Sequence, residues 1–291
     1  FSWTTHVSFD TVLFVSLDPK NESSLLTLTV SRGSMNKEEM LKQAKDPKYI
    51  SGIFNYCDRW CERCQFTSRC LNCTLVEQQF GDLKAVDEFN EEFWESFSEM
   101  LQNTLDLVKE MAKEEGIDID KICVEEDTHK KTALLPDIIS HLSKKYAKSV
   151  DEWFKSNEYL FYEKENELNR IQLVSSGHNP AREALTITDA IEIIQWYQNL
   201  VSVKLTRAGE SAAEEAIDDD GFPKDSEGSA KVALIGIDRS IAAWKILLAH
   251  LTADKREIIG LVELLENLKN RVEKRFPHAR SFKRPGFDDP S

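Results

Sequence analysis

Hydrophobic residues recur at spacings of three and four along most of the chain after residue 82. In residues 83–114 this pattern comprises Leu83, Val86, Phe89, Phe93, Phe97, Met100, Leu101, Leu105 and Val108. Such spacing places the apolar side chains on one face of a helix. Comparable stripes predict helices over residues 136–173, with a break near Ser156, and over 184–208, 229–251 and 254–276. We therefore predict an all-α fold, a helical bundle of about five or six longer helices.

Changes in the pattern suggest four segments. Residues 1–34 are rich in Ser, Thr and Val without a helical period, and Met35 opens an ordinary helix start. We interpret 1–34 as a poorly ordered translated leader, with the natural protein beginning at Met35; an N-terminal β-hairpin is the alternative. Residues 35–80 are cysteine-rich, residues 81–276 form the bundle, and residues 277–291 are an extended tail.

Two local structures bear on function. Residues 48–64 are expected to form a helix that leads into the cysteines. Residues 208–228 are acidic and contain Gly, Pro and Ser, so we expect an exposed loop there.

Composition and charge limit the classes of partner. Hydrophobic residues make up 41% and charged residues 30% of the 291 residues, which is typical of a globular protein. The formal net charge of -14 disfavours nucleic acid and anionic membranes as partners. No run approaches the roughly 18 apolar residues that a membrane span needs. We expect a cytoplasmic protein, with a protein partner as the open possibility.

Five of the six cysteines lie within seventeen residues, with the spacing C-x3-C-x2-C-x5-C-x2-C. Clustered thiols in a chain without an export signal indicate metal binding rather than disulfides. On a helix, Cys57, Cys61 and Cys64 would project from one face, and a turn would bring Cys70 back to complete a tetrahedron of thiolates. We expect these four to bind metal. Cys73 is the alternate ligand, either left over or replacing Cys57 in a double C-x2-C arrangement.

The identity of the metal stays open at this point. Zinc and an iron–sulfur cluster both accept four thiolates, and zinc is preferred. The first reading is a structural four-cysteine zinc site in an interaction or scaffold module. The alternative is a redox or electron-transfer protein that uses the same cysteines. Arg59, Arg63 and Arg69 would offset the negative charge of the thiolates, and Trp60 and Phe66 would shield the site. Buried thiols without metal are the remaining interpretation.

The cysteine segment resembles an uncharacterised group of bacterial proteins with the signature Y-C-D-x-W-C-E-R-C-x-F-T-x-R-C, matched here from Tyr56 to Cys70. The likeness extends less specifically to residues 228–244 and to the tail at 284–288. This resemblance implies no activity.

A second constellation lies within the predicted bundle. Glu192, Asp238 and His250 interrupt strongly apolar helices, and buried charges need partners. They could form an acid/base or metal site. The favoured interpretation is structural: an ion pair of Asp238 with Lys204 or Arg207, or exposure to solvent. No nucleophilic catalytic arrangement can be read from the sequence, so whether the chain is an enzyme stays open.

Overall fold

A computed structural model describes residues 42–43, 45–80, 138–174, 179–215, 224–251 and 255–288, together with isolated positions between 98 and 116. The expected leader at 1–34, the connection that contains Cys123 and most of the expected helix at 83–114 lie outside the described residues. The chain divides into two compact units. The first contains Asn55–Trp60 and Thr132–Ser291, and the second contains Val7–Phe54 and Cys61–Lys131.

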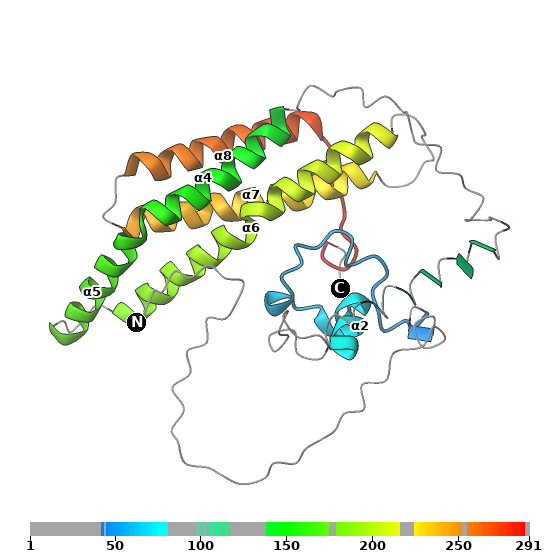
Figure 1. The fold of residues 1–291 in the computed structure, drawn as a ribbon, viewed down its shortest axis with the longest axis horizontal. Coiled ribbons are helices and arrows are strands. Elements are labelled where there is room, and N and C mark those ends of the chain that lie inside the picture. The colour runs from blue at the N-terminus through cyan, green and yellow to red at the C-terminus, as the bar shows by residue number, and fades with distance from the viewer. Residues whose placement is uncertain are drawn as a thin grey trace, which may run out of the picture. The chain divides into compact units, whose positions relative to one another are not determined.

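The first unit is a helical bundle, which confirms the all-α prediction. Its helices are α4 (Ile138–Ser156), α5 (Glu158–Val174), α6 (Pro180–Glu215), α7 (Asp225–His250) and α8 (Lys255–Arg275). Helices α4, α6, α7 and α8 each pack against two of the others, and α5 packs against α4 and α6 (Figure 1). No strand occurs among the residues that the structure describes.

The helical stripes account for the core. In α4 the residues at spacings of three and four, Tyr146, Val150 and Trp153, are buried. Ile139 is buried as well, whereas the adjacent Ile138 is 47% exposed, although both apolar residues were expected to belong to the buried stripe of the helix predicted from residue 136. Helices α6 and α7 approach closely at Gly236, where a Cβ atom would lie 2.7 Å from Cδ1 of Tyr197. Small residues at such crossings allow two helix backbones to come together.

Helix α6 is longer than its hydrophobic pattern predicts. It begins at Pro180, a favoured first position, where the Asn179 side chain accepts a hydrogen bond from the backbone N–H of Arg182 at 3.1 Å. It continues to Glu215, so the expected loop at 208–228 was wrong over 208–215 and over the first residues of α7. The Ala and Glu residues in AGESAAEE favour helix strongly enough to outweigh one glycine.

Asn157 separates α4 from α5, as the sequence predicted. Its side-chain Nδ2 donates to the carbonyl oxygen of Trp153 at 3.0 Å and to the carboxylate of Glu257 on α8 at 3.1 Å. This buried amide therefore caps the end of α4 and joins it to the neighbouring helix.

Candidate functional site

The cysteines lie in turns and short helices. Cys57 is in a bend of the first unit, and the other four belong to the second unit. Cys61 begins the 3-10 helix η1 (Cys61–Arg63), Cys70 follows η2 (Thr67–Arg69), and Cys73 is in the first turn of α2 (Leu71–Phe80). The expected helix at 48–64 was therefore wrong, because residues 51–57 form turns.

A left-handed backbone conformation explains why no helix crosses this segment. Arg59 has a φ of 61°, and Gly52 has a φ of 70°. The backbone N–H of Trp60 bonds to Oδ1 of Asp58, two residues earlier, at 3.2 Å. This local side-chain bond offers the backbone an alternative to helical pairing. Cys57, Cys61 and Cys64 therefore do not lie on one face of a common helix, contrary to the prediction from the sequence.

In the second unit, the Cys73 thiol lies within electrostatic range of Cys61 and of Cys70. Burial, together with the smaller effects of the neighbouring Cys61, Glu77 and Cys70, raises the pKa of the Cys73 thiol to about 12. Cys73 is 9% exposed, and its thiol lies 3.6 Å from the Glu77 carboxylate. The mutual repulsion that these groups would suffer as anions is the condition that a divalent cation relieves.

Cys64 is held differently. Its Sγ accepts a hydrogen bond from the backbone N–H of Phe66 at 3.4 Å. A donor aimed at sulfur stabilises the thiolate over the thiol.

None of the five described cysteines forms a disulfide. In the described parts of both units, no three His, Cys, Asp or Glu side chains are already arranged to hold a metal ion. Thiolate donors are ligands of zinc and of iron–sulfur clusters alike, and the described side chains do not form a finished coordination geometry for either.

Asp58 anchors the turn before the first 3-10 helix to the bundle. The Tyr197 hydroxyl donates to Oδ2 of Asp58 at 2.5 Å, and Arg239 donates to the same oxygen at 2.9 Å and also to the Tyr197 hydroxyl. The Trp196 indole N–H donates to the Asp58 carbonyl oxygen at 2.9 Å. Burial raises the pKa of Tyr197, and the adjacent Asp58 carboxylate raises it further.

Trp60 completes this anchor. Its ring stacks on Trp196 with the centroids 4.9 Å apart and the planes at 11°. Trp60 is buried in the bundle core, so its described role is packing in the first unit. Phe66 is half-buried, and Arg59, Arg63 and Arg69 are exposed.

Asp225, in the first turn of α7, joins this helix to the end of α6, a contact that the sequence did not suggest. It accepts two bonds from Arg207, at 2.9 and 2.6 Å, and one from Ser211 at 2.8 Å. Although burial opposes ionisation, these bonds and a further one from the Tyr56 hydroxyl hold the pKa of the Asp225 carboxyl below its usual range. Only the proximity of α6 and α7 reveals this pairing, since the sequence pattern placed Asp225 inside the loop predicted at 208–228.

The second constellation resolves into separate ion pairs. Asp238 pairs with Arg280 at 2.6 Å and lies 3.5 Å from Lys269, so the expected pairing with Lys204 or Arg207 was wrong. His250 lies 2.9 Å from Glu183. Glu192 is exposed on α6.

Lys204 is instead buried, with 6% of its surface exposed, and it lies within electrostatic range of Cys57. Burial lowers the pKa of its ammonium group; Arg207 and Arg59 lower it further, and the Cys57 thiolate opposes them.

No protein-family model, curated protein or solved structure matches the chain. None of the described helices combines the length and apolar character that crossing a bilayer needs.

Proposed function

We propose that the cysteine-rich segment binds one zinc ion through four thiolates, and that this structural site lets the chain act as an interaction or scaffold module. The close spacing of the cysteines in the sequence carries the proposal, and the electrostatic effect of Cys61 and Cys70 on the Cys73 thiol supports it. Cys64 supplies the fourth thiolate. This set forms the double C-x2-C arrangement, and all four of its cysteines belong to one unit. Cys57 is the competing fourth ligand.

The secondary structure supports metal-dependent ordering of this segment. The three-residue helices η1 and η2 contain no buried residue, and Ile53 and Cys73 are the buried apolar residues described in the second unit. The described turns bury few apolar side chains, so a metal ion that joins them would add folding free energy. Binding requires the thiols to lose their protons and converge, so site formation and local folding occur together.

Metal analysis of purified variants tests the proposal and its ligand set. Wild-type protein, purified without oxygen, should contain about one zinc per chain and be colourless. Cys70→Ser should lose the metal, and the matched control Cys57→Ser should retain it. Protein without zinc would contradict the proposal. Brown protein that contains iron would show that the cysteines hold an iron–sulfur cluster instead of zinc. Zinc loss in Cys57→Ser would contradict the set that includes Cys73.

A further inference from the structure

The end of the chain folds back on itself in a tight turn. The N–H of Phe287 donates to the carbonyl oxygen of Arg284 at 3.2 Å, and Gly286 has a φ of 75°. Pro285 followed by this glycine is the pattern of a type II turn, which needs a positive φ at its third residue. The turn returns Asp288 to Arg284, whose backbone N–H lies 2.9 Å and whose Nε lies 3.1 Å from Oδ2 of Asp288.

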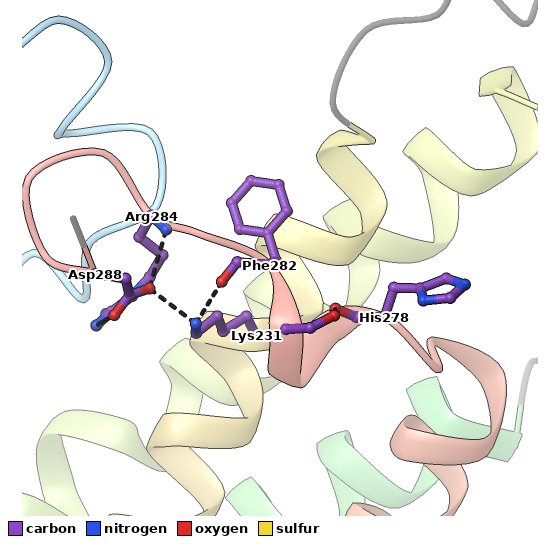
Figure 2. Close-up of polar contacts among 6 residues, drawn as sticks. Lys231, His278, Phe282, Arg284 and Asp288 are labelled. Atoms are coloured by element: carbon purple, nitrogen blue, oxygen red, sulfur yellow. Dashed lines mark hydrogen bonds and ion pairs between the residues drawn. The ribbon is translucent and has the colours of Figure 1, made fainter. Parts of the chain in front are cut away.

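Lys231 of α7 joins this turn to the bundle. Its Nζ lies 2.8 Å from Oδ2 of Asp288 and also donates to the carbonyl oxygen of Phe282 (Figure 2). The side chains of Lys231 and Asp288 are 15% and 24% exposed. Burial alone would raise the pKa of the Asp288 carboxyl, but the bonds from Arg284 and Lys231 hold it far below its usual range. Charge-assisted bonds of this kind are stronger than neutral ones.

The same segment presses an aromatic ring against the turn that carries Cys57. The rings of Phe282 and Tyr56 meet edge to face, with centroids 4.8 Å apart. Gly228 of α7 lies beneath both, since a Cβ atom there would lie 2.3 Å from Tyr56 and 2.8 Å from Phe282. Tyr56 is therefore enclosed by α7 on one side and by the chain end on another, and Cys57 is the next residue.

We propose that residues 282–288, the strap, form a latch that holds Asn55–Trp60 on the bundle and limits access to Cys57. Two independent contacts close the latch: the Lys231–Asp288 ion pair and the Phe282–Tyr56 ring contact. Cys57 itself is half-buried. The inference deepens the proposed function, because Trp60 directly precedes the first proposed zinc ligand, Cys61. Opening the strap would free the Tyr56 ring and expose Cys57, while Asp58 and Trp60 stay anchored to α6 and α7.

The rate at which N-ethylmaleimide labels Cys57 tests the latch. Labelling of the full chain is followed by peptide mass spectrometry, with a chelator present so that metal plays no part and with the reductant removed before the maleimide is added. Asp288→Asn should raise the rate roughly tenfold by opening the turn locally. Phe282→Leu, which keeps every ion pair, should raise it by a smaller factor. Asp151→Asn is the matched control, because it breaks an exposed ion pair on α4, in which Nζ of Lys155 lies 2.7 Å from Oδ2 of Asp151.

The outcomes separate the latch from the zinc site. Equal Cys57 labelling rates in wild type, Asp288→Asn and Phe282→Leu would overturn the latch, even in a protein that contains zinc. Faster labelling in both variants supports the latch, even if purified wild type contains no metal. Hydrogen exchange of α7 distinguishes local opening from unfolding: faster labelling accompanied by loss of protection throughout α7 would overturn the latch.

Discussion

Asp58 shows how one carboxylate positions a whole turn. Its side chain accepts bonds from Tyr197, from Arg239 and from the backbone of Trp60, and its carbonyl oxygen accepts one from Trp196. Removing an acceptor of this kind leaves buried donors without a partner, which costs more than the bond itself contributes. Asp58 and Trp60 thus have a structural role in holding this turn on the bundle.

The first prediction at this scale concerns Gly228. Gly228→Ala should lower the free energy of unfolding by about 1–3 kcal/mol, because the new methyl group overpacks against Tyr56 and Phe282. The control is Gly209→Ala on α6, where no atom lies within 4 Å of the added Cβ. That change should stabilise the protein by roughly 0.5–1 kcal/mol, since glycine is a poor helix former. Urea denaturation measures both. Equal stabilities of the two variants would contradict the close contact at Gly228.

At the scale of elements, hydrophobic periodicity predicted the body of α4, α6, α7 and α8 and the break at Asn157. It failed where polar contacts set the boundaries. The end of α6 has few apolar residues, yet Arg207 and Ser211 pair with Asp225 there. A helix was expected over residues 48–64, but the Asp58 turn and the left-handed Arg59 oppose it. Contacts between residues distant in sequence decide such ends, and a single sequence does not reveal them.

Asp225→Asn should loosen the end of α6. The substitution weakens a bidentate pair whose arginine side chain is 43% exposed, so we expect a loss of about 1 kcal/mol after solvent screening. Hydrogen exchange should show the loss of protection mainly in residues 208–215. Asp151→Asn, which removes an exposed i,i+4 pair, should leave that segment unchanged. Uniform protection of 208–215 in both variants would show that the Asp225 contacts do not sustain this extension.

At the scale of the whole molecule, the buried tyrosines predict a loss of stability in alkali. Burial raises the pKa of Tyr146 to about 12, whereas in the unfolded chain it ionises near its ordinary value of about 10. Between these values unfolding releases a proton, so the free energy of unfolding falls as pH rises, by up to about 1.4 kcal/mol per pH unit.

Tyr146→Phe should therefore make the decline in stability between pH 10 and 12 shallower. Its stability at neutral pH should also fall, because the Trp244 indole N–H loses the hydroxyl that accepts its bond at 3.1 Å. Tyr162→Phe is the control, since this side chain is 67% exposed and solvated in both the folded and the unfolded state. Denaturant titrations at several pH values measure the slopes. Parallel slopes for wild type and Tyr146→Phe would contradict the assignment.

The spacing of the thiols was sufficient to predict a candidate metal segment, but not its anchor. Nothing in the local sequence links Tyr56 to Phe282, or Asp58 to Arg239, because 226 and 181 residues separate them. Lys231 and Asp288 likewise meet only because the tail returns to the start of α7.

X-ray absorption at the zinc edge of the purified wild-type chain tests the central claim most directly. The proposal requires a first coordination shell of four sulfur atoms at about 2.3 Å. A shell of nitrogen and oxygen atoms near 2.0 Å would mean that bound zinc lies elsewhere. A chain that retains no zinc after purification without chelators would contradict the claim outright.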